Sequence, residues 1–146
     1  AYDLEPNSPD VIQTYAAILT YDGRWKEAIP LFRLSLRLNP KPPTYYYRQF
    51  GHALRLSGQH EEAMVLLKKA IAQEPNDLIA HLMFAVAASL GGFDEEAQAA
   101  AKEILRIDPQ FSVKRLKAPF KDKIHMQIAC DALNKAGLNL DCDALK

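Results

Sequence analysis

The chain has 146 residues, of which 49% are hydrophobic and 25% charged, and this composition excludes a chain that is disordered throughout. Lysine plus arginine equals aspartate plus glutamate at 18 each, so no global field draws the chain to nucleic acid or a membrane surface. The longest strongly apolar run, residues 78–90, is too short to span a bilayer. A chain of this size needs no disulfide framework, so we expect a cytoplasmic protein with Cys130 and Cys142 as reduced thiols.

Two sequence markers recur along the chain with one shared period. The first is a proline after a polar residue, found at Pro6, Pro40, Pro75 and Pro109 with spacings of 34, 35 and 34. The second is a Gly-x-x-x-Glu-Ala box, which begins at Gly23, Gly58 and Gly92 and ends 12 residues before the next proline. Two independent markers with the same period indicate three copies of an internal repeat.

Between these markers, apolar residues return at the three-and-four spacing of amphipathic helices. The predicted helices cover residues 11–21, 25–38, 44–56, 61–73, 77–90 and 94–107. Ser8, Pro9 and Asp10 form a helix start signal. It combines a capping hydroxyl, a proline at a position where its missing N–H group costs nothing, and an acidic residue in the first turn. Gly23 can supply the positive φ that ends the first helix.

Small residues and bulky residues recur at fixed positions of the repeated pattern. The small ones are Ala16, Ala28, Ser35, Gly51, Ala63, Ala70, Ala85 and Ala97, and the bulky ones are Tyr15, Leu19, Phe32, Phe50, Leu54, Leu67 and Phe84. A large side chain opposite a small one allows two helices to pack closely without a void. Over residues 9–109 this pattern resembles the tetratricopeptide repeat (TPR), a helix–turn–helix unit of about 34 residues. The resemblance implies an all-α fold, a right-handed TPR superhelix or α-solenoid of three repeats with C-terminal capping helices.

The resemblance divides the chain into six parts. These are the end of a preceding truncated repeat over 1–8, repeats over 9–42, 43–77 and 78–110, capping helices over 111–138 and a tail over 139–146. Ala1 stands in the register of Ser35 and Ala70, so we expect the chain to be a fragment of a longer protein. Ile104 stands in the same register, and its bulk predicts that an ordinary repeat does not follow it.

The segment after the third repeat differs from the repeats. It contains a short predicted helix over 111–116, a break over 119–122 and an amphipathic helix over 124–136. Gly137 ends this last helix, and Leu138 follows it as the usual hydrophobic contact. The segment is similar to one that closes bacterial TPR proteins, often at the C-terminus of class III adenylate or guanylate cyclases and related regulators.

In the TPR family the first helix of each repeat lines a concave groove that binds peptides or proteins. The groove positions carried over by the resemblance are Gln13, Ala17, Thr20, Tyr45, Arg48, His52, Arg55, Leu82, Val86 and Ser89. Arg48, His52 and Arg55 share one helix face, which either holds an acidic segment or is a solvated surface. Leu82 and Val86 either mark an apolar partner site or are covered by the C-terminal helix of the same chain.

The remaining candidates for chemistry favour ordinary structural roles. The four histidines, His52, His60, His81 and His125, lack the helical spacing of a zinc site, and Cys130 reads as a small core residue. The basic residues Lys114, Arg115, Lys117, Lys121 and Lys123 read as a solvated face. We expect no catalytic residue, metal, cofactor, nucleic acid or membrane partner.

The function predicted from the sequence is therefore non-catalytic. It is a protein–protein interaction module, the C-terminal regulatory TPR region of a larger bacterial signalling protein. Its partner is another protein, a peptide or another domain of the same chain, bound through the groove. The alternative is a TPR scaffold that pairs with a second copy of itself.

Overall fold

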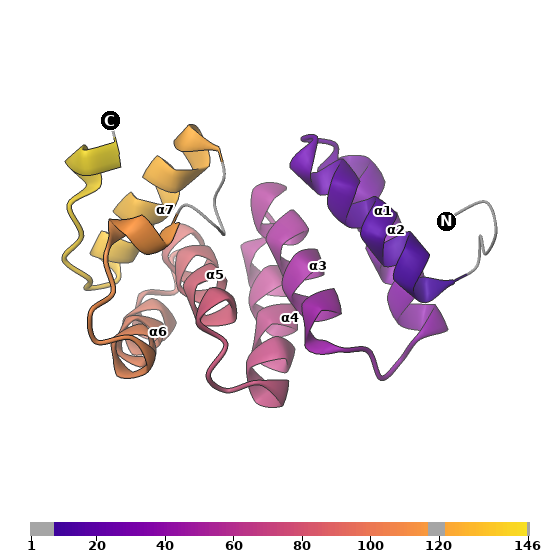
Figure 1. Ribbon diagram of the computed structural model, residues 1–146, viewed down its shortest axis with the longest axis horizontal. Coiled ribbons are helices and arrows are strands. Elements are labelled where there is room, and N and C mark those ends of the chain that lie inside the picture. Colours follow the sequence, from indigo (N-terminus) through magenta and orange to yellow (C-terminus); the bar gives the residue numbers. More distant parts are fainter. Residues whose placement is uncertain (1–7, 117–121, 146) are drawn as a thin grey trace. The chain divides into compact units, whose positions relative to one another are not determined.

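The computed structural model describes residues 8–116 and 122–145, and in these ranges every regular element is helical (Figure 1). The elements are α1 (Pro9–Tyr21), α2 (Trp25–Leu38), α3 (Thr44–Leu56), α4 (His60–Gln73), α5 (Leu78–Leu90), α6 (Asp94–Ile107), η1 (Val113–Leu116), α7 (Lys123–Lys135) and η2 (Cys142–Leu145). The six repeat helices and α7 confirm the predicted order, whereas the short 3₁₀ helix η2 was not predicted. None of the described helices combines the length and hydrophobicity needed to cross a membrane.

The chain divides into two compact units, Ala1–Glu74 and Pro75–Lys146, which we call the first and second units. The first unit contains the helix pairs α1/α2 and α3/α4, and the second contains the pair α5/α6 followed by η1, α7 and η2. Each unit is described by itself.

Glycines end the first helix of each pair in the way that the repeated boxes predict. Gly23 has φ of +80°, and the N–H of the following Arg24 donates to the carbonyl of Leu19 at 2.8 Å. The same arrangement ends α7, where Gly137 has φ of +116° and the N–H of Leu138 donates to the carbonyl of Leu133 at 3.1 Å. A left-handed glycine followed by this hydrogen bond is the Schellman motif, which reverses the chain without leaving helix carbonyls unpaired.

Helix starts agree less well with the sequence prediction. Ser8 stands at the start of α1, but its hydroxyl makes no capping hydrogen bond, and the carbonyl of Ser8 instead accepts from the N–H of Ile12 at 3.0 Å. The prediction of a capping hydroxyl was therefore wrong. Asp77 and Asp122 are the aspartates that do cap helices, since their carboxylates accept from backbone N–H groups of α5 and α7.

In the first unit α3 packs on both α1 and α2. The ring of Phe50 on α3 stacks on that of Phe32 on α2, with centroids 5.4 Å apart and planes inclined by 15°. On the other side of α3, Gly51 faces Leu67 of α4, and the predicted small residues Ala63 and Ala70 are fully buried. The large and small residues of α2, α3 and α4 therefore pack as the sequence predicts, whereas Tyr15 on α1, predicted at such a position, is 45% exposed.

In the second unit α7 packs on α5, and its other substantial contacts among the described residues are with η1 and η2 (Figure 1). This arrangement differs from that of α3, which rests on both helices of the preceding pair. Ile104 of α6 is fully buried at the position where the other repeats have a small residue. The structure therefore confirms that the third repeat is not followed by an ordinary fourth one.

Some predicted features lie outside the described residues. They are the end of a preceding repeat in residues 1–7 and the break and basic residues in 117–121, including Lys117 and Lys121.

Candidate functional site

Three of the predicted groove residues lie together on one side of α3. Tyr45, Arg48 and His52 are each partly exposed, as helical spacing on one face allows. The ring of Tyr21, at the end of α1, lies beside His52, with the two ring centroids 6.3 Å apart. Tyr21 is 63% exposed, so aromatic and cationic groups share an accessible surface. We call Tyr21, Tyr45, Arg48 and His52 the α3 face.

Tyr45 also connects the α3 face to the start of α1. Its hydroxyl donates to a carboxylate oxygen of Asp10 at 3.4 Å, and the neighbouring Tyr46 hydroxyl donates to the same oxygen. Burial raises the pKa of Tyr46, and the hydrogen bond to Asp10 raises it further, so this hydroxyl remains protonated and keeps donating. The orientation of the α3 face relative to α1 is thus fixed by hydrogen bonds.

Arg55 does not belong to this surface, although the sequence placed it there. Its side chain is only 4% exposed, and burial lowers the pKa of its guanidinium to about 10. One guanidinium nitrogen lies 3.3 Å from Nδ1 of His52, and the charge acts on His60 at the start of α4. Arg55 is therefore an internal residue of the first unit, although it lies on the same helix face as Arg48 and His52.

The candidates on α1 are buried as well. Gln13, Ala17 and Thr20 have exposures of 0, 8 and 4%. The amide nitrogen of Gln13 donates to the side-chain oxygen of Gln49 at 3.0 Å and to the carbonyl of Tyr46 at 3.3 Å. These three residues are scaffold rather than accessible groove, because α3 packs over their side of α1.

The candidates on α5 lie beneath the C-terminal helix. Leu82, Val86 and Ser89 recur at helical spacing and are no more than 2% exposed. The Ser89 hydroxyl donates to the carbonyl of Ala132 in α7 at 2.8 Å. Of the two alternatives that the sequence left open, the structure shows the one in which the chain covers this face itself.

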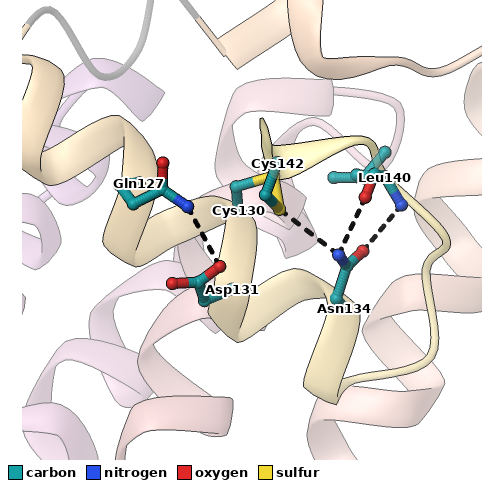
Figure 2. Close-up of a disulfide and its surroundings, with 6 residues drawn as sticks. All are labelled: Gln127, Cys130, Asp131, Asn134, Leu140 and Cys142. Atoms are coloured by element: carbon teal, nitrogen blue, oxygen red, sulfur yellow. Dashed lines mark hydrogen bonds between the residues drawn. A yellow bond between two sulfur atoms is a disulfide. The ribbon is translucent and has the colours of Figure 1, made fainter. Parts of the chain in front are cut away.

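The two cysteines form a disulfide, so the prediction of reduced thiols is wrong for this structure (Figure 2). Cys130 is buried in α7, and Cys142 lies 12 residues later in η2. The chain reverses at Gly137 between them, which brings η2 back onto α7. The sequence signal for this pairing was a helix-ending glycine between the two cysteines. The prediction of reduced thiols rested instead on the chain being large enough to fold without a disulfide.

The side chain of Asn134 supports the same connection from α7. Its amide oxygen accepts from the N–H of Leu140 at 2.7 Å, and its amide nitrogen donates to the carbonyl of Leu140 at 2.9 Å and to the sulfur of Cys142 at 3.3 Å (Figure 2). One side chain thus pairs both backbone groups of a residue in the tail.

An exposed apolar stripe runs along α1 and includes Tyr15, which the sequence assigned to a bulky packing position. Tyr15, Ile18 and Tyr21 are 45, 59 and 63% exposed. One repeat later, the counterparts of Tyr15 and Ile18 are Phe50 and Ala53, which are buried at 2 and 0%. The repeat register contains a signal for this difference in exposure. The counterparts on α3 belong to a helix that packs on α2, whereas α1 is the first described helix and has no described helix pair before it.

The described residues contain no group of three histidine, cysteine, aspartate or glutamate side chains that could hold a metal ion.

Comparison with known proteins supports the repeat. Residues 54–118 match the family model of the tetratricopeptide repeat. A stretch of 77 residues, 53% of the chain, is 32% identical to small glutamine-rich tetratricopeptide repeat-containing protein 2 of Mycosarcoma maydis. The match spans only 22% of that protein, so it concerns the repeat and not the whole relative.

Solved structures agree on the fold. MamA from Desulfovibrio magneticus RS-1 is similar with a TM-score of 0.71 and 20% identity, over 92% of this chain and 77% of that one. YrrB, described as a TPR protein with an unusual peptide-binding site, is similar with a TM-score of 0.68 and 20% identity, over 92% of this chain and 70% of that one. At this identity the likeness shows the fold, which is that of the TPR solenoids.

Proposed function

We propose that this chain is a non-catalytic interaction module that binds a protein or peptide segment on the α3 face. The observation that carries the proposal is the partly exposed row of Tyr45, Arg48 and His52 beside the exposed ring of Tyr21. The TPR fold is generally an interaction fold without catalysis, and the similar protein YrrB is described as having a peptide-binding site.

The chemistry of the α3 face fits an acidic segment with apolar side chains. The guanidinium of Arg48 offers several N–H donors to a carboxylate, and such charge-assisted hydrogen bonds are stronger than neutral ones. The rings of Tyr21 and Tyr45 offer apolar area together with polar edges. A partner of this kind belongs either to another protein or to another domain of the same polypeptide, and its binding weakens as salt concentration rises.

A pair of labelled peptides tests the proposal. The first is a short peptide of glutamate and leucine, and the second carries lysine in place of each glutamate. We expect fluorescence anisotropy to show binding of the acidic peptide alone and an affinity reduced about tenfold or more by Arg48→Glu. Arg37→Glu, an exposed residue on α2, makes the same change in charge elsewhere and serves as the control. Equal binding by both variants would remove the α3 face from the proposal.

The wider context is proposed on the sequence resemblance alone. It comprises a regulatory role in a larger bacterial signalling protein, a cytoplasmic location and a C-terminal segment of the kind that follows class III cyclases. The full-length reading frame tests it, because such a protein carries a catalytic or signalling domain in the same polypeptide.

Self-association is the second candidate function, and the exposed stripe of Tyr15, Ile18 and Tyr21 on α1 favours it. Sedimentation equilibrium over a range of concentrations tests this candidate. If the stripe pairs two copies, Ile18→Glu gives a monomer, whereas Val65→Glu on α4, a residue of similar exposure, leaves the mass unchanged. A wild-type protein that is monomeric throughout excludes self-association and leaves the α3 face untouched.

A further inference from the structure

The C-terminal part of the second unit is attached to the rest in two different ways. Helix α7 is held on α5 by buried side chains, among them Ala129 and Leu133, and by the hydrogen bond from Ser89 to Ala132. Helix η2 contacts α7 and η1, yet it contributes no buried residue. The hydrophobic effect therefore stabilises the docking of α7 and contributes little to the docking of η2.

A covalent and a polar link join η2 and the residues before it to α7. One is the Cys130–Cys142 disulfide, and the other is the set of hydrogen bonds from Asn134 to Leu140 and Cys142 (Figure 2). Hydrogen bonds at a partly exposed site contribute little net stability, because water offers the same groups competing partners. Such bonds do not offset the conformational entropy lost when residues 139–145 are ordered. The covalent link is thus the strongest attachment of this segment to α7.

We propose that the Cys130–Cys142 disulfide is a redox-operated clasp for residues 139–145. In the oxidised protein the clasp holds η2 against α7 and η1. In the reduced protein the segment is released, while α7 stays on α5 because the contacts that hold it do not involve the segment. The proposal concerns the second unit alone and does not depend on binding at the α3 face.

The reductant that opens the clasp is a dithiol. Its thiolate attacks the sulfur of Cys142, which is partly exposed, because Cys130 is fully buried. This attack forms a mixed disulfide and displaces Cys130 as a thiolate, which takes up a proton. The second thiol of the reagent then closes the cyclic disulfide of the reagent and frees Cys142 as a thiol, so two electrons pass from the dithiol to the protein disulfide.

Release of the segment changes the surface around α7. It uncovers the side of α7 that carries Cys130 and Asn134 and removes η2 from η1. In a cytoplasmic setting reductants keep thiols reduced, so the clasp would stand open and close under oxidation. In an oxidising compartment the clasp would stay closed.

Hydrogen exchange measured by NMR on the whole chain tests the clasp. The reporters are the amides of Leu140, Cys142 and Ala144, each of which donates a hydrogen bond in the closed form. With dithiothreitol, we expect these amides to exchange about tenfold faster or more, while the amides of Val86 and Leu133 keep their protection. Cys142→Ser should show the fast exchange without reductant and should not respond to it.

A matched pair of variants separates the disulfide from the hydrogen bonds. Asn134→Ala removes the amide that contacts the segment, whereas Gln127→Ala removes an amide on α7 that bonds only to Asp131 among the residues in Figure 2. We expect both oxidised variants to keep the segment on α7 and to release it with dithiothreitol. Equal exchange of the segment in the oxidised and reduced proteins would overturn the proposal. So would loss of protection throughout α5 and α7 on reduction, or alkylation of both cysteines in the oxidised native chain.

Discussion

The hydroxyl of Ser35 donates a hydrogen bond of 2.7 Å to the side-chain oxygen of Gln13 and so connects α2 to α1 inside the first unit. The amide nitrogen of Gln13 continues the connection to Gln49 on α3. Gln13 and Ser35 are both fully buried, so one glutamine joins three helices in a place where water cannot replace it.

Replacing Gln13 should therefore destabilise the protein more than a surface substitution does. Gln13→Ala leaves a void and takes the acceptor from Ser35, and we expect a loss of about 2–3 kcal/mol in the free energy of unfolding. Urea unfolding followed by circular dichroism measures this value. The exposed Gln59→Ala is the control and should change stability by less than about 0.5 kcal/mol. The double variant Gln13→Ala/Ser35→Ala tests the coupling. If its loss of stability equalled the sum of the two single losses, the two side chains would not be coupled.

A second prediction concerns Gly51. A Cβ atom at this position would lie 2.8 Å from Cγ of Leu67, which is fully buried and cannot move aside freely. Overpacking of this kind costs about 1–3 kcal/mol, and the better helix propensity of alanine offsets about 1 kcal/mol of it. We expect Gly51→Ala to lower the free energy of unfolding by about 1 kcal/mol, and by no more than about 2 kcal/mol. The cost of the same substitution should shrink in a Leu67→Val background, and an unchanged cost there would contradict the clash.

The repeat and its turns were predictable because their signals are local. The positive φ of Gly23 and the helix stop at Gly137 depend on residues within one turn of each glycine. The pairing of large and small residues, such as Leu67 with Gly51, follows from the repeated period of the sequence. Local rules of this kind hold whatever the rest of the chain does.

The candidate site was less predictable because exposure depends on distant neighbours. Arg48 and Arg55 lie two helical turns apart on the same face of α3, yet only Arg48 remains partly exposed once α3 is packed. Gln13 was assigned to the groove by its register, and contacts 33 and 36 residues away determine its burial. The disulfide requires the chain to reverse after α7, and the presence of two cysteines does not by itself predict that reversal.

A third prediction follows from the different surroundings of the two arginines. Arg55→Glu places a carboxylate where a guanidinium is buried, and we expect it to destabilise the protein by at least about 3 kcal/mol. Arg48→Glu changes a partly exposed group and should cost less than about 1 kcal/mol. Thermal unfolding of the two variants measures the difference. Comparable melting temperatures would contradict the internal position of Arg55 and return it to the solvated helix face that the sequence left open.

A fourth prediction concerns pH. Burial lowers the pKa of His60 below its ordinary value of 6.5, and the nearby charge of Arg55 lowers it further. The unfolded chain therefore binds a proton at a pH where the folded chain does not. The resulting stability is complete above the unfolded pKa and is lost as pH falls below about 6.5. We expect the urea midpoint of the wild type to fall more between pH 7.5 and 5.5 than that of His60→Gln. Identical pH dependence of the two proteins would show that His60 titrates alike in both states.

The last prediction uses the size of a stability change to decide what the disulfide holds. A disulfide that closes a loop of this length stabilises a protein by about 3 kcal/mol when only the unfolded chain is constrained by it. If residues 139–145 leave α7 on reduction, the folded chain gains most of the same freedom, and the two effects largely cancel. We therefore expect Cys142→Ser to lower the free energy of unfolding of the second unit by less than about 1 kcal/mol. Urea unfolding of the oxidised wild type and the variant, followed by the NMR signals of α5, measures this difference. A loss near the full value would mean that the segment stays on α7 without its disulfide.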